Sequence, residues 1–116
     1  MFCRIIMETI KFSDWQKLDL RTGKILKVED VEGADRLYKL TIDIGSEKRT
    51  LIAGLKAHYP KEKLKGKKVI VFTNLEPRTI RGIESKGMIL AAVDEEKNEV
   101  RLLTSDNEIE TGKRIC

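Results

Sequence analysis

The sequence is short of the residues that build metal centres and catalytic sites. It contains two cysteines, Cys3 and Cys116, at opposite ends of the chain, and a single histidine, His58. No CxxC pair and no Cys/His spacing is present, which argues against a zinc site. No serine, aspartate or cysteine arrangement accompanies His58, so a catalytic function has no support. We therefore predict a protein that is not an enzyme and uses no cofactor.

Long apolar stretches are also missing. No run approaches the roughly 18 apolar residues of a membrane span, and residues 1–12 lack the apolar core and cleavage pattern of a signal peptide. These absences predict a cytoplasmic protein with no membrane partner. Free thiols are the default in that compartment, and a disulfide between Cys3 and Cys116 is the alternative. Met7 is an alternative start of the chain.

Aromatic residues make up only 5% of the chain. The strand-like segments described below hold few of them beyond Tyr38 and Phe72. Proteins that bind single-stranded nucleic acids in general stack several bases on aromatic side chains. The scarcity of aromatics therefore argues against a stacking platform of this kind.

Basic charge is concentrated in the middle of the chain and acidic charge toward its end. Residues 61–86 hold eight Lys or Arg against three Glu, whereas residues 94–110 hold seven acids against two basic residues. A clustered basic face is expected of a protein that binds a polyanion, and a solvated surface with chance clustering is the alternative. Together with the low aromatic content, this pattern favours a folded RNA, recognised by shape and backbone charge.

Alternating apolar and polar residues predict a chain of short strands. The alternation is clearest in residues 36–45, where Leu40, Ile42 and Ile44 share one face. Pro60 suits the first turn of a short helix, which Gly66 ends. Further strands are predicted at 20–33, 48–55, 68–75 and 88–94, with a sixth candidate at 99–105.

Five strands with a short helix after the third describe an OB-fold, a small five-stranded Greek-key barrel. We therefore predict an all-β fold with a core at 13–94 and extensions at 1–12 and 95–116, the latter a dimer contact. Ser13 is predicted to cap a short helical turn at the start of the core. The OB-fold binds ligands on strands 2 and 3 and in the loops that follow strands 1 and 4, which here are 31–36 and 73–92.

The sequence also resembles one family closely, from Leu18 to Ile115. The resemblance rests on the stretches LDLRTGKILKVEDVEGADRLYKLTIDIG, RTLIAGL, VFTNLEPRTIRGIESKGMILAA and TGKRI. They are similar to the tRNA-binding domain of methionyl-tRNA synthetases, which occurs at their C-terminus, as an archaeal beta chain and as free-standing dimers. The resemblance implies a non-catalytic homodimer built from terminal extensions, which binds the outer corner of tRNA with little dependence on sequence. It also implies a methionyl-tRNA synthetase catalytic chain as a candidate partner.

The resemblance and the charge pattern together nominate the residues that contact tRNA. Arg36 stands where the family motif has lysine, so the charge is kept but a planar fork replaces a point charge. Asn74, Ser85 and Met88 match residues of the family motif. Arg78, Arg81 and Lys86 are added because they are basic residues of the same loop. The predicted contact set is Arg36, Asn74, Arg78, Arg81, Ser85, Lys86 and Met88.

Each of these residues also has a structural alternative. Asn74 can serve turn chemistry after a strand, Ser85 can bond to a turn backbone, and Met88 can pack in the core. Arg36 can be a solvated loop charge. For the two arginines of the long loop, the alternative is a surface ion pair with Glu76 or Glu84.

The surroundings of the loop are predicted to shape it or to add to its field. Gly82 and Gly87 are predicted to supply positive φ or to permit close approach of the backbone to the ligand. The lysine-rich segment 61–68 either extends the field that attracts tRNA or only solvates a face.

A second function remains open at this point. A related homodimeric OB-fold family acts as an export chaperone that binds unfolded polypeptide and has a similar RG..S.GM loop. A chaperone of this type is expected to expose an apolar groove at its dimer seam. The density of Lys and Arg around the loops favours RNA instead.

Overall fold

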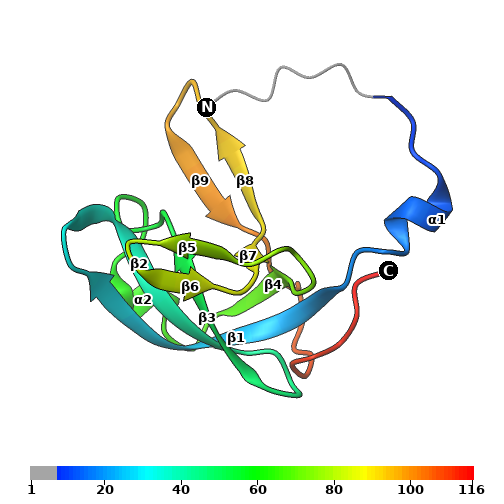
Figure 1. The fold of residues 1–116 in the computed structure, drawn as a ribbon, viewed down its shortest axis with the longest axis horizontal. Coiled ribbons are helices and arrows are strands. Elements are labelled where there is room, and N and C mark those ends of the chain that lie inside the picture. Colours follow the sequence, from blue (N-terminus) through cyan, green and yellow to red (C-terminus); the bar gives the residue numbers. More distant parts are fainter. Residues whose placement is uncertain (1–7) are drawn as a thin grey trace.

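A computed structural model describes residues 8–116, which are mostly strand with two one-turn helices (Figure 1). Cys3 and Met7, and with them the alternative disulfide and start, lie outside these residues. None of the helices in the described part is long and apolar enough to cross a membrane. The elements are α1 (Phe12–Trp15), β1 (Leu20–Val31), β2 (Ala34–Asp43), β3 (Lys48–Ala53), α2 (Lys61–Leu64), β4 (Lys68–Phe72), β5 (Arg78–Ile80), β6 (Ile83–Ser85), β7 (Met88–Ile89), β8 (Ala91–Asp94) and β9 (Glu99–Leu102).

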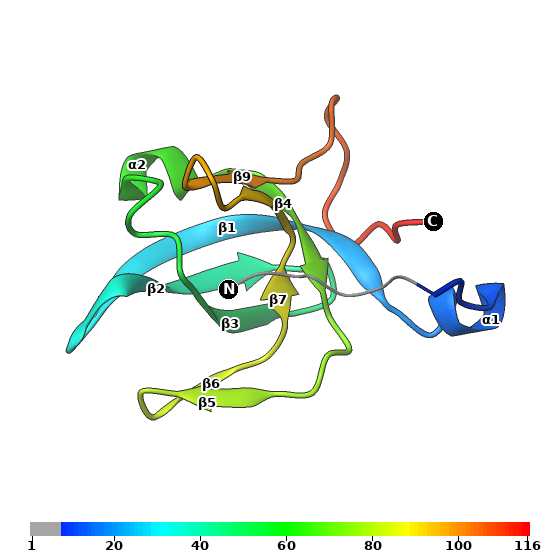
Figure 2. The same ribbon diagram turned by 90° about the horizontal axis from the view of Figure 1, so that it is seen from above.

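The main sheet is antiparallel and has the strand order β3-β2-β1-β4-β7. The long strand β1 pairs with β4 along its first half and with β2 along its second half. Because β1 belongs to both halves, the sheet curves around it (Figure 2). The short helix α2 lies between β3 and β4 in sequence, as the OB-fold pattern predicts.

The inward faces of these strands form the hydrophobic core. In β2 every second residue from Tyr38 to Ile42 is buried, which confirms the predicted alternation in this part of the strand. The middle of β4 is buried at three consecutive positions, as its continuous apolar run indicates. Burying one such aliphatic side chain contributes about 1.5–3 kcal/mol. The most deeply buried side chains are Ile25, Leu40, Ile42, Leu51, Leu64, Val69 and Val71.

Among residues 8–116, no strand ladder joins β3 to β7, so the barrel is not closed by strand pairing. Isolated hydrogen bonds cross the gap instead, two of which involve a backbone N–H. The backbone N–H of Lys86 donates to the carbonyl of Thr50 at 3.0 Å, and the N–H of Ile52 donates to Ser85 Oγ at 3.0 Å. These bonds attach the segment that carries β6 to the free edge of β3.

Residues 78–85 form a β-hairpin where the sequence predicted only an irregular loop. We call this hairpin the arm. Its strands β5 and β6 pair around Arg81 and Gly82, whose φ values are 53° and 77°. Two successive positive φ values in a two-residue connection indicate a type I′ turn, which suits the twist of a hairpin. Figure 2 shows the arm as a separate layer beside β3.

Gly87 follows the arm and allows the chain to pass close to β4. Its φ is +132°, and a Cβ at this position would lie 2.9 Å from the carbonyl oxygen of Phe72. Both conditions exclude a larger residue without strain. The predicted positive φ of Gly82 and Gly87 is thus confirmed. The close approach of Gly87 is to β4, and an approach to a ligand stays a prediction.

The start and the end of the described chain meet at a polar cluster that we call the terminal clamp (Asp19, Arg21, Thr73 and Arg114). The Thr73 hydroxyl donates to Asp19 Oδ2 at 2.7 Å, and Arg21 Nε donates to Asp19 Oδ1 at 2.9 Å. Arg114 Nη2 donates to the carbonyl of Gln16 at 2.9 Å. The hydrogen bond from Thr73, followed by that from Arg21, lowers the pKa of Asp19.

The prediction for Ser13 is wrong, because α1 begins at Phe12 and Ser13 lies within it. The preceding residue, Lys11, has an extended backbone, and no side chain caps the helix. The sixth strand candidate is confirmed as β9, which pairs with β8. The predicted boundary at residue 94 falls inside this hairpin, at the end of β8. The hairpin stands away from the main sheet (Figure 1).

Candidate nucleic-acid interface

The tip of the arm approaches the turn between β1 and β2. A Cβ built on Gly33 in that turn would lie 3.8 Å from Nη1 of Arg81. The loops after the first and the fourth barrel strand therefore meet in space, although they are far apart in sequence. Arg36 follows the same turn on β2 and is exposed.

The three predicted arginines are available to a ligand. Arg36, Arg78 and Arg81 are all exposed, and none makes a side-chain hydrogen bond or ion pair with another described residue. The alternative of ion pairs with Glu76 or Glu84 is therefore not realised within residues 8–116. Lys86 does pair with Glu84, at a distance of 3.7 Å between Nζ and Oε1, but both side chains are more than half exposed. Exposed pairs of this kind are weak and open to exchange for a ligand.

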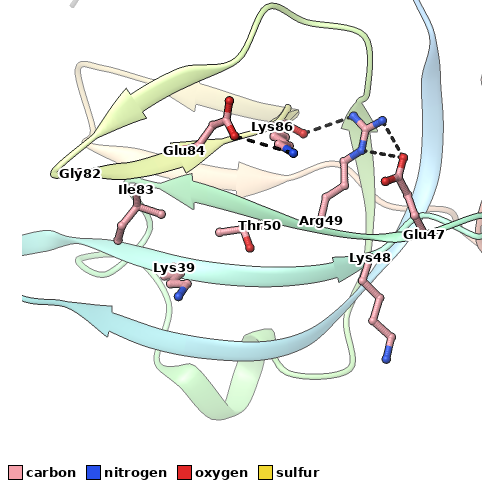
Figure 3. A pocket seen from close by; sticks show the side chains of 9 residues that line it. All are labelled: Lys39, Glu47, Lys48, Arg49, Thr50, Gly82, Ile83, Glu84 and Lys86. Atoms are coloured by element: carbon pink, nitrogen blue, oxygen red, sulfur yellow. Dashed lines mark hydrogen bonds and ion pairs between the residues drawn. The ribbon is translucent and has the colours of Figure 1, made fainter.

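A groove of about 470 Å³ lies between β3 and the arm (Figure 3). Four basic side chains and two carboxylates line it. Glu47 is bonded to Arg49 and Glu84 to Lys86, whereas Lys39 and Lys48 have no ion-pair partner among the described residues. The groove therefore carries a positive balance. Its lining residues are Lys39, Glu47, Lys48, Arg49, Thr50, Gly82, Ile83, Glu84 and Lys86.

The strand register continues this basic groove onto the outer face of the sheet. Lys48 pairs with Asp43 across β3 and β2, and Asp43 pairs with Lys24 across β2 and β1. Residues opposite one another in antiparallel strands project to the same face. Lys24 and Lys48 are exposed and lack ion-pair partners among residues 8–116. This is the face on which an OB-fold holds its ligand.

Sequence reasoning missed Lys39, Lys48 and Arg49 as members of this groove. A usable signal was present, because Lys39 alternates with the buried residues Leu40 and Ile42 and must face outward. Combined with the ligand face of the OB-fold, this alternation identifies Lys39. The position of Lys48 depends on the register of β3, which the sequence does not show.

No aromatic side chain lines the groove. Tyr38, one of the two aromatics noted on the strand segments, is buried, and its hydroxyl donates to the carbonyl of Tyr59 at 2.8 Å. The Tyr59 hydroxyl in turn accepts the backbone N–H of Leu102 at 3.1 Å. These tyrosines hold the scaffold together, so the groove offers charge and hydrogen bonds rather than stacking surfaces.

Two of the predicted contact residues are engaged in structural hydrogen bonds. Ser85 is buried, and its Oγ accepts the N–H of Ile52. The side-chain amide of Asn74 accepts the N–H of Asp19 at 2.8 Å and donates to the carbonyl of Lys17 at 2.7 Å. The structural alternatives stated for both residues are thus realised, and their contact with tRNA stays a prediction.

Met88 and Arg78 lie on the other side of the arm. They line a small cavity of about 60 Å³ beneath it, together with the apolar residues Ile52, Leu75 and Ile80. Met88 is 45% exposed at the edge of the sheet, so it is not a core residue as its structural alternative proposed. Its flexible thioether is accessible at the place where the arm joins β7.

The lysine-rich segment around α2 lies across the barrel from the arm (Figure 2). Here the carboxylate of Asp30 accepts from Lys61 at 2.9 Å and lies 3.0 Å from Lys56. The hydrogen bond from Lys61, followed by that from Lys56, lowers the pKa of Asp30. This segment therefore does not share a face with the groove. Across residues 8–116, no cluster of His, Cys, Asp or Glu is arranged to hold a metal.

The model of the family described as "Putative tRNA binding domain" matches residues 20–114 of this chain. The chain belongs to this family. It is a tRNA-binding domain and not a catalytic domain. Among curated relatives, the methionine–tRNA ligases of Pyrococcus horikoshii and Methanocaldococcus jannaschii are 51% and 47% identical to it over 109 residues. The alignments cover 94% of this chain but only 15% and 17% of those ligases.

Two solved structures have the same fold as this chain. A methionyl-tRNA synthetase related protein from Pyrococcus horikoshii superposes with a TM-score of 0.88 at 34% identity, covering 95% of this chain and all of that one. The CsaA chaperone protein from Picrophilus torridus superposes with a TM-score of 0.84 at 32% identity, covering 93% of this chain and all of that one. The predicted all-β fold and the predicted family are both confirmed.

Proposed function

We propose that this tRNA-binding domain captures folded tRNA in the groove between β3 and the arm and on the adjoining outer face. The observation that carries the proposal is that Lys39 and Lys48, from β2 and β3, line the groove without ion-pair partners among the described residues. Phosphate oxygens of tRNA are the complementary ligand. The proposed contacts are Arg36, Arg78, Arg81, Lys86 and Met88, with Lys24, Lys39 and Lys48 added from the structure and with Asn74 and Ser85 nearby.

Recognition in this proposal is by shape and backbone charge. The groove lacks aromatic platforms, so splayed single-stranded bases would find no stacking partner there. A folded RNA instead presents several phosphates in a fixed arrangement, which a rigid set of cations can match. Binding therefore has little dependence on the sequence of the tRNA.

The test is filter binding of total tRNA over a range of salt, with single-stranded and duplex RNA as controls. We expect tighter binding of tRNA than of either control and a log affinity that falls steeply with log salt. Each phosphate contact adds roughly 0.7–0.9 to the slope. An affinity that is nearly independent of salt, or equal for the three RNAs, would overturn the proposal.

The proposed cellular role is that of a beta chain or trans-acting appendage of a methionyl-tRNA synthetase. Its support is the similarity to the C-terminal part of methionine–tRNA ligases, of whose length this chain spans about 15%. Such a domain raises the local concentration of tRNA at the catalytic chain. Adding the protein to a methionyl-tRNA synthetase that lacks this domain is expected to lower the KM for tRNA and leave kcat unchanged. An unchanged KM for tRNA would contradict the proposed role beside a synthetase.

The proposed assembly is a homodimer that buries the terminal regions. A groove of about 190 Å³ runs between α1 and the C-terminus and is lined by Phe12, Trp15, Leu18 and Ile115 among others. Phe12 is 70% exposed, an unusual position for a large apolar side chain unless a partner covers it. Sedimentation equilibrium is expected to show a dimer that the Phe12→Asp substitution dissociates. A monomeric wild-type protein would contradict the proposal.

A chaperone function is the second candidate, favoured by the same apolar groove and by the similarity to CsaA proteins. The distribution of charge favours tRNA, because the arginines of the arm make no side-chain bond with another described residue, whereas Arg114 in the apolar groove donates to the carbonyls of Gln16 and Leu18. Direct competition discriminates between the two functions. An unfolded peptide that displaces labelled tRNA at equal concentration would favour the chaperone.

A further inference from the structure

We propose that Arg49 is a positioning residue that holds the arm against β3, and so fixes the basic side chain of Lys86, the residue that follows the arm, along the groove. The inference rests on the proposed tRNA-binding function and deepens it, since it names the residue on which the shape of that site depends. Arg49 lies on β3 at the base of the groove, where Figure 3 shows its guanidinium between Glu47 and the backbone of Lys86.

All three nitrogens of the Arg49 guanidinium donate to groups of the protein. Nη1 donates to the carbonyl of Thr73 and, at 3.4 Å, to the carbonyl of Lys86. Nε and Nη2 donate to Glu47 Oε2 at 3.3 Å and 3.0 Å. One planar group thereby ties β3 to the end of β4 and to the end of the arm. A lysine ammonium cannot reproduce this fork.

These contacts of Arg49 lie where the barrel is not closed by strand pairing in the described part of the chain. The barrel has no ladder between β3 and β7 among the described residues, so few bonds attach the arm. They are the Lys86 N–H to Thr50, the Ile52 N–H to Ser85, and the bonds of Arg49 to Thr73 and Lys86. Among residues 8–116, Arg49 is the one side chain that bonds to the backbone on both sides of the arm.

Arg49 is poorly placed to bind a phosphate itself. Its side chain is only 22% exposed, and the carboxylate of Glu47 lies 3.0 Å from Nη2. The neighbouring Lys48 is exposed, has no partner among residues 8–116 and points into solvent from the same strand. Arg49 therefore acts through the arm, whereas Lys48 acts on the ligand.

The direct test is hydrogen exchange, measured site by site by NMR, in Arg49→Met and Arg49→Lys, with Lys48→Gln as the matched loss of one charge from the same strand. We expect the amides of Lys86 and Ile52 to exchange about tenfold faster in both Arg49 variants, because the bonds of a charged donor are lost. The amides of β2 serve as the internal reference. Wild-type exchange at Lys86 and Ile52 in the folded variants would overturn the proposal.

A double-mutant cycle for tRNA binding separates positioning from direct contact. Arg49→Met is expected to weaken tRNA binding about tenfold in the wild-type background. The loss is expected to be much smaller in a Lys86→Gln background, because the charge that Arg49 positions is then already absent. Arg49→Lys, which keeps the charge, is expected to resemble Arg49→Met. Additive losses, or full binding by Arg49→Lys, would overturn the positioning role.

The two tests also separate this inference from the proposed function. If the wild-type protein binds tRNA no better than duplex RNA, the proposed function fails, and the exchange of Lys86 and Ile52 still decides whether Arg49 holds the arm. If tRNA binds as proposed but exchange is unchanged in the Arg49 variants, only the positioning role fails.

Discussion

The terminal clamp and the arm both depend on arginines but use them in opposite ways. In the terminal clamp, Arg21 donates to Asp19 and to the carbonyl of Gly112, and Arg114 donates to carbonyls of the chain near α1. In the arm, Arg78 and Arg81 make no side-chain bond with another described residue. Both regions are basic, but only the second leaves its charge for another molecule.

This difference shows that the partners of a basic residue indicate its role better than its exposure does. A guanidinium whose donors already meet carbonyls and carboxylates stabilises the fold, and a ligand must displace those bonds to reach it. A solvated guanidinium without partners can bind a phosphate without breaking a hydrogen bond within the protein. Arg49 sits in the groove but has the bonding pattern of the terminal clamp, which is why we assign it to positioning.

The largest expected effect on tRNA binding comes from the unpaired cations of the groove. The double substitution Lys39→Gln and Lys48→Gln is expected to weaken tRNA binding roughly 30-fold and to lower the salt slope by roughly 1.5, because two phosphate contacts are lost. The measurement is filter binding over a range of salt. If the affinity and the salt slope kept their wild-type values, the unpaired cations of the groove would not be the residues that bind tRNA.

The matched control is Lys63→Gln with Lys65→Gln, which removes the same charge from exposed lysines beside α2. Because α2 lies across the barrel from the arm (Figure 2), the loss of affinity is expected to stay within about twofold. Equal losses for the two pairs would mean that net charge, and not the groove, attracts tRNA.

The largest expected effect on the free energy of unfolding tests how the arm is attached. Gly87→Ala places a Cβ 2.9 Å from the Phe72 carbonyl at a φ of +132°, so it is expected to lower the free energy of unfolding by roughly 3 kcal/mol. Gly82→Ala has the same chemistry at positive φ, but nothing lies within 4 Å of its Cβ, and roughly 1 kcal/mol is expected. Urea denaturation measures both values. Equal costs would show that the approach of Gly87 to β4 does not matter.

The terminal clamp is tested by Asp19→Ala. This substitution leaves the Thr73 hydroxyl and Arg21 without their carboxylate, and a loss of about 1–3 kcal/mol in the free energy of unfolding is expected. The affinity of the folded protein for tRNA is expected to remain at the wild-type value, because Asp19 does not line the groove. A large loss of affinity without a loss of stability would reverse the roles of the two regions.

The smallest effect is a dependence of stability on pH. The pKa of Asp19 is lowered from its ordinary value of 3.8, chiefly by the hydrogen bond from Thr73. The stabilisation is therefore complete above about pH 4 and is lost as the pH falls through the lower folded-state pKa. Thermal unfolding between pH 6 and pH 2 is expected to show a shallower acid decline for Asp19→Asn than for the wild-type protein. Parallel declines would exclude Asp19 as the group responsible.

The sequence predicted the strands and the core well, because alternation is a local property. Leu40 and Ile42 are buried and Lys39 faces outward, as their spacing requires. The arm was missed because residues 73–87 carry a proline, two glycines and many charges, and Arg81 gives no local sign of a left-handed backbone. The helix cap at Ser13 was wrong because α1 begins one residue before Ser13.

For the candidate site, the sequence identified the loop and the basic residues within it, but not which side chains are free. The amide of Asn74 is bonded to residues 17 and 19, and the hydroxyl of Ser85 is bonded to β3. These partners are distant in sequence, so no local pattern reveals them. For the same reason, no local pattern placed Lys48 and Arg49 in the groove, because their positions depend on the register of β3 against the arm.

By itself, the sequence determined the all-β class, the core positions, the excess of basic residues and the family, since these follow from residue type and short spacing. The tertiary structure decided which cations share a groove and which are already bonded within the protein. Charge acts through distance, and distances between separate strands are set only when the sheet has formed.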